Sequence, residues 1–374
     1  MSCRTWPCRA GQGTSCTNLE DVTILENVPL APYTTLGVGG PARWMVETGD
    51  EGEILAAVRF AREHGAPHFI LGGGSNLLVK DTGFPGVVIR VTGSATEWSD
   101  GGDGFATICA DAGMDWDAVV QLAVAKNCAG IECLAGIPGS VGGTPVQNVG
   151  AYGQEVSHSI ARVHALDLEA GQVVHLAAAE CGFTYRRSIF NSSQMGRYAI
   201  MRVEYSLKLD GAPHLEYRDV KQYFADRGVL SPTLMETAVA VRAVRARKGM
   251  LLDAADADSS SAGSFFKNPI VDAAILPRLA AVAGCRVDEI PQFPAGAGHT
   301  EGKVKLSAAW LIEQAGFHKG SSLGRAGLSS KHVLAIVNRG GATAAEIIAL
   351  RDAVIAGVWE RTAIKLEQEP VMLG

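Results

Sequence analysis

The 374-residue sequence has few aromatic side chains and no excess of positive charge. Aromatic residues make up 6% of the chain, and 39 Asp and Glu outnumber 33 Lys and Arg, which gives a net charge of −6. Proteins that bind nucleic acid rely on basic surfaces and, for single strands, on stacked aromatic side chains. The composition therefore argues against a nucleic-acid partner, although a local basic patch can still attract a small anion.

The sequence also lacks a run that is apolar enough to cross a membrane. Its longest uncharged stretch, about residues 133–154, is interrupted by Gly, Pro, Asn and Gln. The first 17 residues lack the apolar segment of a secretory signal peptide. We therefore expect a cytoplasmic protein with no membrane contact.

The eight cysteines form no C-x-x-C pair and do not have zinc-site spacing, so we expect neither a disulfide framework nor a bound metal. Three of them, Cys3, Cys8 and Cys16, lie in a polar N-terminal segment. We interpret residues 1–18 as a disordered leader. A metal or redox site in this segment is the alternative interpretation.

Several common catalytic motifs are missing. The chain contains no G-x-x-x-x-G-K-[ST] and no H-E-x-x-H, and the glycines after residue 71 do not complete G-x-G-x-x-G. Residues 320–324 match G-x-S-x-G, but they follow a predicted helix instead of a strand. A P-loop, a zinc protease, a Rossmann fold and a hydrolase serine are therefore all disfavoured.

Glycine, in contrast, is abundant. The chain has 44 glycines, about 12% of its residues, against roughly 7% in an average protein. They cluster in residues 70–76 and 136–153. Clustered glycines expose main-chain N–H groups and allow a phosphate to approach closely. Two long turns without a ligand are the alternative, and composition does not decide between the two.

The apolar pattern predicts a mixture of helices and strands, which favours a protein of several small α+β or α/β domains. One helix is predicted to begin near Ser231, with Pro232 in its first turn and Gly249 just after its end. Another is predicted after the capping-box pair Thr343 and Glu346. Residues 251–264 are polar and predict a loop or linker. The other predicted helices cover residues 51–65, 115–127 and 306–317, and the predicted strands cover 67–71, 86–91, 162–169 and 198–209.

Six motifs occur in a fixed order along the chain. They are TTLGVGGPA (34–42), ILGGGSNLLV (70–79), GIPGSVGGTPVQNVGAYG (136–153), YRRSIF (185–190), AGSFFKNP (262–269) and LEQEP (366–370). Together they closely resemble the UDP-N-acetylenolpyruvoylglucosamine reductase (MurB) family, which are flavoenzymes of bacterial cell-wall synthesis. The resemblance covers about residues 27–374.

This resemblance implies an α+β architecture, in which a two-subdomain FAD-binding fold of the vanillyl-alcohol-oxidase (PCMH) type is followed by an α+β substrate-binding domain. The first subdomain is then expected over residues 19–93 together with 369–374. The second is expected over 94–247, and the substrate-binding domain over 248–368. The resemblance also suggests a monomer.

The family uses non-covalently bound FAD and takes its hydride from NADPH. Carried over to this sequence, the resemblance implies that both glycine clusters hold the FAD, the first of them through main-chain N–H groups. The residues expected to bind the cofactor are Gly72, Gly73, Gly74, Ser75, Asn76, Leu77, Ile137, Pro138, Gly139, Ser140, Gln147, Gly150, Ala151, Tyr152 and Gly153.

For catalysis, the resemblance implies that Arg186 stabilises an enolate and that Ser264 donates a proton. Glu369 matches the family glutamate by its distance from the terminal residues, but Glu367 is a rival because the local pattern departs from the usual one. A fork of donors and a placed proton donor are what reduction of an enolpyruvyl group requires.

The expected contacts to UDP-N-acetylglucosamine enolpyruvate are Tyr217, Lys248 and Asn268, and Tyr217 indicates the tyrosine-loop type of the family. Arg242 and Arg245 share one helix face. They are predicted either to attract a diphosphate or simply to be solvated. Two other functions stay open: an FAD-dependent oxidase of the same fold, and a nucleotide-sugar binder without redox chemistry.

Overall fold

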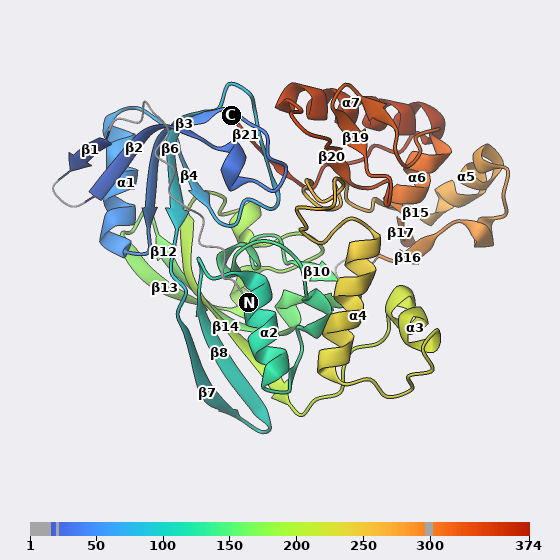
Figure 1. The fold of residues 1–374 in the computed structure, drawn as a ribbon, viewed down its shortest axis with the longest axis horizontal. Coiled ribbons are helices and arrows are strands. Elements are labelled where there is room, and N and C mark those ends of the chain that lie inside the picture. The colour runs from blue at the N-terminus through green and yellow to red at the C-terminus, as the bar shows by residue number, and fades with distance from the viewer. Residues whose placement is uncertain (1–15, 20–21, 296–301) are drawn as a thin grey trace.

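The computed structural model describes residues 16–19, 22–295 and 302–374. Its chain forms two parts that are each built on a large sheet, followed by a third part with several helices (Figure 1). Most of the predicted leader, residues 1–15, lies outside the described residues. None of the described helices combines the length and apolarity needed to cross a membrane. The helices are α1 Glu51–Glu63, α2 Trp116–Ala125, α3 Arg218–Ala225, α4 Leu234–Arg247, α5 Leu276–Ala283, α6 Ala308–Gln314 and α7 Ala344–Thr362.

The first sheet has the order β1-β2-β3-β6-β4. The β1–β2 and β2–β3 pairs are antiparallel, and the β3–β6 and β6–β4 pairs are parallel. The predicted leader boundary at residue 18 falls inside β1. Outside this sheet, β5 (Leu77–Val79) pairs in parallel with the C-terminal β21 (Val371–Leu373). The strands of the sheet are β1 Cys16–Leu19, β2 Val22–Pro29, β3 Pro41–Thr48, β4 His68–Leu71 and β6 Phe84–Val91.

The second sheet is antiparallel, with the order β13-β12-β14-β8-β7, and a short β9 also pairs with β14. Its inner face is covered by helices, because Trp116 of α2 lies 5.4 Å from the ring of Tyr205 in β14. The strands are β7 Thr96–Gly102, β8 Phe105–Asp111, β9 Cys128–Ala129, β12 Ile160–Asp167, β13 Gln172–Ala177 and β14 Tyr198–Leu209. A separate hairpin is formed by β10 Gly150–Ala151 and β11 Gln154–Glu155.

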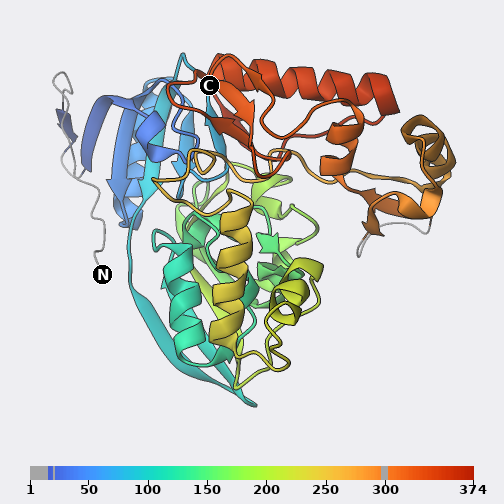
Figure 2. The same cartoon turned by 45° about the vertical axis from the view of Figure 1, so that its right-hand side comes forward.

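The third part carries α5, α6 and the long α7 beside two small sheets (Figure 2). Their orders are β15-β17-β16 and β18-β19-β20, and all neighbouring strands in them are antiparallel. The strands are β15 Ile270–Asp272, β16 Gln292–Pro294, β17 Lys303–Leu306, β18 Ser322–Leu323, β19 Ala326–Leu328 and β20 Ile336–Asn338.

The helix ends follow local capping chemistry. As predicted, α7 begins after Thr343, whose hydroxyl accepts a hydrogen bond from the Glu346 N–H at 3.1 Å. The predicted start of α4 at Ser231 is wrong. The N-cap is Thr233, because it exchanges hydrogen bonds with Glu236 in a capping box. Gly249 follows α4 with φ +66°, as expected for the residue after a helix.

The segment 251–264, predicted to be a loop or linker, is a packed loop. Asp258, Ser259 and Ser261 are buried. The Lys331 ammonium lies 2.7 Å from a carboxylate oxygen of Asp256, and the Ser330 hydroxyl donates to Asp258. These contacts hold the loop against residues 330 and 331, in the third part of the chain.

Candidate active site

A cleft of about 490 Å³ lies where the two glycine-rich loops meet the third part of the chain. Its walls come from the loop after β4, the loop around residues 137–152, the turn at residue 186, residues 259–268 and the segment before β21. All residues predicted to act in catalysis or to bind cofactor or substrate line this cleft except Gly153. Residues far apart in sequence are thus gathered in one place.

The two glycine-rich loops pack backbone against backbone. A Cβ atom at Gly73 would lie 2.5 Å from Cα of Gly139 and 2.7 Å from the main-chain nitrogen of Ser140. At Gly74, where φ is +61°, a Cβ would lie 1.8 Å from the Tyr33 carbonyl oxygen. Glycine is therefore required here by the contacts of the loop with neighbouring backbone, in addition to any need for a ligand to approach.

The same loops leave polar groups without protein partners. Ser140 Oγ is buried and has no hydrogen-bond partner among the residues that the structure describes. Within the described residues, no hydrogen bond is donated by the main-chain N–H groups of Gly73, Gly74, Ser75 or Asn76. Hydroxyl groups and consecutive N–H groups are donors that suit phosphate oxygens. The lining of this end of the cleft therefore fits the diphosphate of FAD.

Asn76 ties the first loop to the second loop and to the C-terminal segment. Its Nδ2 donates to Gln147 Oε1 and, at 3.2 Å, to the carbonyl of Glu369. The carbonyl of Asn76 in turn accepts from Val371 N at 2.9 Å, where β21 begins to pair with β5. The first glycine-rich loop and the segment carrying Glu369 are thus held as one unit.

Arg186 projects from a tight turn in which Thr184 and Arg187 exchange main-chain hydrogen bonds of 2.9 and 3.1 Å. Its Nη2 donates to the Gly150 carbonyl at 2.7 Å, and its Nε lies 3.0 Å from Oε1 of Glu369. The guanidinium therefore bridges the second glycine-rich loop and the C-terminal segment.

The guanidinium of Arg186 stays positively charged. Burial tends to lower the pKa of Arg186, but the Glu369 carboxylate, the Tyr185 hydroxyl and the Glu155 carboxylate together raise it above its usual value. The side chain is 19% exposed, so it can meet a ligand in the cleft while staying shielded from bulk water. A fixed cation with several donors suits an incoming carboxylate.

Ser264 is held beside the segment that carries Glu369. The Glu369 N–H donates to the Phe265 carbonyl at 2.9 Å, and Phe266 and Gln368 form an antiparallel bridge. Both phenylalanines are fully buried and anchor this pairing. The half-buried Ser264 therefore reaches the cleft from a rigid backbone.

The two candidate glutamates lie in different surroundings. Glu369 lines the cleft, and its side chain is 13% exposed. The side chain of Glu367 is 74% exposed and lies 3.7 Å from the Lys267 ammonium. The geometry therefore favours Glu369 for a role toward a ligand.

At the other end of the cleft, Lys248 combines with aromatic side chains. Its Nζ lies 2.5 Å from Asp219 Oδ2, and 5.7 and 5.8 Å from the ring centres of Tyr217 and Tyr152. Burial tends to lower the pKa of Lys248, but Asp219 and the two tyrosines raise it, so the ammonium stays charged. Asn268 also lines the cleft, and its Oδ1 accepts from Ala308 N at 2.9 Å. A cation beside aromatic faces suits a nucleotide diphosphate.

The two arginines on α4 both have partners within the protein. Arg242 Nη2 lies 2.6 Å from Asp117 Oδ1, which also accepts from the Gly136 N–H at 2.6 Å. The buried Arg245 donates to the Gly136 carbonyl at 3.1 Å. Both arginines therefore hold the start of the second glycine-rich loop, and Arg245 also lines the cleft.

Gly153, predicted to bind the cofactor, does not line the cleft and belongs to the turn of the β10–β11 hairpin. Tyr152 and Gly153 have φ values of +51° and +89°, which suit a tight two-residue turn. A Cβ atom at Gly153 would lie 2.5 Å from Nε2 of His214. The turn and this packing account for the glycine without a ligand.

Sequence reasoning missed several lining residues, among them Tyr185, Asn191 and His332. Tyr185 and Asn191 flank Arg186 in the sequence, and the Asn191 side chain donates to the Arg186 carbonyl at 3.1 Å, so proximity could have indicated them. Burial, together with Lys248 and Lys319, lowers the pKa of His332 to about 4. His332 comes from a distant loop, and no local pattern marks it.

Comparison with known proteins identifies the family. Residues 42–177 match the FAD binding domain family, and residues 255–373 match the C-terminal domain of UDP-N-acetylenolpyruvoylglucosamine reductase. The reductase of Thermobifida fusca is 44% identical over 94% of this chain and 98% of its own length. The chain belongs to the UDP-N-acetylenolpyruvoylglucosamine reductase family. Another reductase, from Nocardia farcinica, is 47% identical over 94% of this chain and 90% of its own length.

A solved reductase structure has the same fold. The UDP-N-acetylenolpyruvylglucosamine reductase of Thermus caldophilus superposes with a TM-score of 0.63 at 27% identity, covering 96% of this chain and all of the other. The predicted combination of an FAD-binding fold and a C-terminal α+β domain is thereby confirmed. This member of the reductase family is an FAD-dependent oxidoreductase.

Proposed function

We propose that this chain reduces the enolpyruvyl group of UDP-N-acetylglucosamine enolpyruvate, giving UDP-N-acetylmuramate, with non-covalently bound FAD as cofactor and NADPH as hydride donor. The observation that carries this proposal is the meeting of Arg186, Ser264 and Glu369 in one cleft with both glycine-rich loops. The two glycine-rich loops would hold FAD, which would supply the hydride for the terminal carbon of the enolpyruvyl group, with NADPH as the source of that hydride. The protein must then stabilise an anion and supply one proton.

Arg186 stabilises the anion. Hydride addition at the terminal carbon shifts negative charge onto the substrate carboxylate. The guanidinium already contacts the carboxylate of Glu369 and a main-chain carbonyl, so it is oriented before the substrate arrives. Preorganised donors lose little free energy to reorganisation during reaction, and this is why Arg186 suits the role.

Ser264 gives the proton to the carbon next to the substrate carboxylate. A serine hydroxyl is a weak acid, so it can act only when it is held in place and its proton is replaced. The backbone pairing at Phe265 holds Ser264 beside the segment of Glu369. Glu369 is then the group that assists the proton transfer or the binding of the substrate carboxylate.

The nucleotide end of the substrate binds to Tyr217, Lys248 and Asn268. Lys248 brings the positive charge, and Tyr217, 38% exposed, is accessible to cover the ligand. The glycine-rich loops, which carry the unpaired donors described above, would hold the FAD. On this basis residues 19–93 with 369–374 and residues 94–247 form the two cofactor subdomains, and residues 248–368 form the substrate domain. The pairing of β21 with β5 supports the first of these assignments.

The decisive experiment separates the two half-reactions. The purified protein should show the visible absorbance of bound flavin, which NADPH bleaches and the enolpyruvyl substrate restores in the absence of oxygen. Ser264→Ala should leave bleaching by NADPH unchanged and slow the return of the flavin colour by roughly 10²–10⁴-fold, as for loss of a general acid. Stopped-flow absorbance measures both rates.

Ser260→Ala is the matched control, because Ser260 lies in the same loop but does not line the cleft. Equal slowing of both half-reactions in Ser264→Ala would mean that Ser264 is structural. Reoxidation by oxygen instead of the enolpyruvyl substrate would favour an oxidase, and a protein that stays colourless with added FAD would favour a simple nucleotide-sugar binder.

A further inference from the structure

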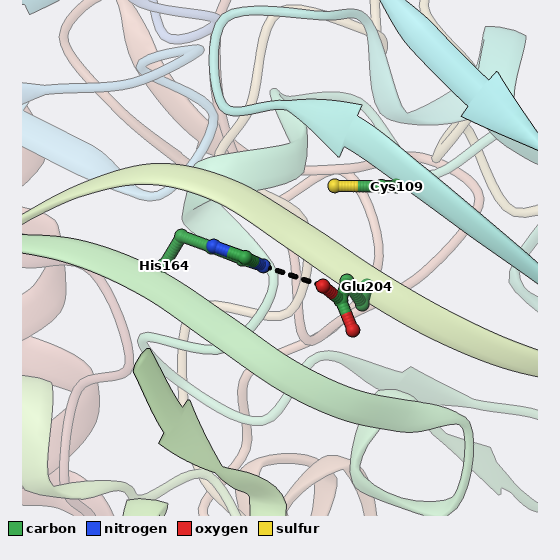
Figure 3. Close-up of side chains that lie close together, drawn as sticks. All are labelled: Cys109, His164 and Glu204. Atoms are coloured by element: carbon green, nitrogen blue, oxygen red, sulfur yellow. Dashed lines mark hydrogen bonds and ion pairs between the residues drawn. The ribbon is translucent and has the colours of Figure 1, made fainter. Parts of the chain in front are cut away.

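Three strands of the second sheet bring a cysteine, a histidine and a glutamate together on the face away from the helices. These residues are Cys109 of β8, His164 of β12 and Glu204 of β14, whose possible metal-ligand atoms all lie within 4.8 Å of one another (Figure 3). Among the described residues, no other group of three His, Cys, Asp or Glu side chains meets this criterion. Cys109 and Glu204 are direct cross-strand partners. A β-bulge at His164 and Ala165 interrupts the pairing of β12 with β14 next to the site. Bulges often re-aim a side chain beside a functional site.

We propose that Cys109, His164 and Glu204 bind one Zn²⁺ ion. Thiolate, imidazole and carboxylate are all zinc ligands, and three protein ligands leave a fourth position for water. Zinc bonds of about 2.0–2.3 Å place ligand atoms roughly 3.3–3.7 Å apart, so small side-chain rotations are enough to close the site. The sulfur and nitrogen donors select against Mg²⁺ and Ca²⁺, which prefer oxygen.

The surrounding charges suit a divalent cation. A thiolate and a carboxylate together neutralise Zn²⁺ when the imidazole is neutral. Arg202 does not compete with the metal, because it already lies 2.9 and 3.2 Å from carboxylate oxygens of Glu97 and Asp111. Arg162 is 3.9 Å from Glu204 and half-exposed, so it can move away into solvent.

A second histidine is placed to orient the first. His164 Nε2 lies 2.7 Å from Glu204 Oε1, and its Nδ1 lies 2.7 Å from His175 Nδ1. A neutral imidazole carries one N–H. Zinc at Nε2 leaves the proton on Nδ1, which then donates to His175. Such outer hydrogen bonds fix the ring of a metal-binding histidine, so His175 is a positioning residue.

The test uses the FAD-loaded protein, freed of metal by chelation, with Cys3, Cys8, Cys16 and Cys285 changed to Ser to remove competing thiols. Titration against a chromophoric zinc indicator should give one tight site per chain. Co²⁺ as a probe should add a thiolate charge-transfer band to the difference spectrum. Mg²⁺ and Ca²⁺ should not displace either metal.

Cys109→Ser and His164→Gln should each remove the site, while His158→Gln, an exposed histidine elsewhere on the surface, should keep it. His175→Gln should weaken zinc binding by roughly 10- to 100-fold with the cobalt band retained. Bound flavin reports that each variant is folded, and Glu204→Gln is a second ligand variant should Cys109→Ser fail this check. One tight site persisting in Cys109→Ser, or no tight site in the parent protein, would overturn the proposal.

Discussion

Arg186 has a backbone conformation that costs free energy. Its φ of +57° lies in the left-handed region, which residues other than glycine adopt at a cost of about 1–3 kcal/mol. The turn at Thr184 and Arg187 and the side chain of Asn191 hold it there. Such strain is concentrated at functional sites, where it aims a side chain that a relaxed backbone would direct elsewhere.

The geometry of this guanidinium predicts the effect of Arg186→Lys. Lysine keeps the charge but cannot contact Glu369 and the Gly150 carbonyl at once, because it has no planar fork of donors. We expect flavin reoxidation by the enolpyruvyl substrate to slow by roughly 10²–10³-fold, the usual cost of losing one preorganised donor. Single-turnover stopped-flow kinetics measures this rate.

Arg187→Lys is the control for this variant, because the neighbouring arginine is exposed and does not line the cleft. Flavin reduction by NADPH should stay at the parent rate in both variants. If Arg186→Lys turned over substrate as fast as Arg187→Lys, the role proposed for Arg186 would be wrong.

At this scale the sequence could name Arg186, Ser264 and Glu369 only through the resemblance to a family. Spacing alone left Glu367 and Glu369 as rivals, since they are two residues apart on one segment. Their difference arises from pairing with residues 265–267, about a hundred positions earlier in the chain. Gly153 was predicted to bind the cofactor but does not line the cleft. A sequence alone does not distinguish a glycine needed for a turn from one that binds a ligand.

Among the larger elements, the two glycine-rich loops depend on each other. The first loop contacts the backbone of the second at Gly73, and Asn76 bonds to Gln147 across the junction. The second loop is held in turn by the two arginines of α4 at Gly136. Neither loop therefore has its shape independently of the other.

Gly73→Ala should separate the loops and weaken cofactor binding. The added Cβ would collide with backbone atoms of Gly139 and Ser140, which cannot rotate away. Overpacking of this kind costs about 1–3 kcal/mol, which corresponds to roughly 5- to 150-fold weaker binding. Flavin fluorescence during titration of the apoprotein with FAD measures the affinity.

Gly52→Ala is the comparison variant, since its new Cβ would meet only the end of the Asp50 side chain, at 3.1 Å. It should bind FAD like the parent. Parent-like FAD affinity in Gly73→Ala would show that the loops do not need this contact.

The elements that the sequence predicted well are those determined by local chemistry. The helix after Thr343 and the strand of residues 198–209 occur as predicted, because a capping box and an apolar pattern depend on near neighbours. The loop at 251–264 occurs as predicted, but its packing and the β5–β21 pair were not predictable in this way. Both are stabilised by residues that are distant in sequence.

In the molecule as a whole, apolar cores cross the expected domain boundaries. Leu36, Val38 and Leu78, from the expected first subdomain, belong to the same buried cluster as Leu311 of α6 and Val354 of α7. Another cluster joins α1 and the first sheet to the second sheet. The predicted domains are therefore not independent packing units.

Asp81, which follows β5, adds a polar link to α7, and its loss should lower the stability of the whole protein. Its two carboxylate oxygens accept from the N–H groups of Ala344 and Ala345 at 2.8 and 2.9 Å. Asp81→Ala should lower the free energy of unfolding by about 0.5–2 kcal/mol, as for the loss of a helix cap. Thermal unfolding followed by circular dichroism and by flavin release measures the change.

Because the apolar cores are shared, the unfolding temperatures measured by circular dichroism and by flavin release should fall by the same few degrees. Asp81→Asn, which keeps one acceptor oxygen, should fall between the parent and Asp81→Ala. Flavin release and loss of helix at clearly different temperatures would contradict the idea that the parts unfold as one.

The pairing of β21 with β5 also bears on how the protein is made. Asn76 donates to the carbonyl of Glu369, in a segment that is synthesised 293 residues later. At about 5–20 residues per second, a ribosome needs about 15–60 s to supply that segment. During this interval Leu78 and Val79, both fully buried in the finished protein, present an unpaired strand edge. We therefore expect the first glycine-rich loop to reach its final conformation only after residues 369–373 have been synthesised.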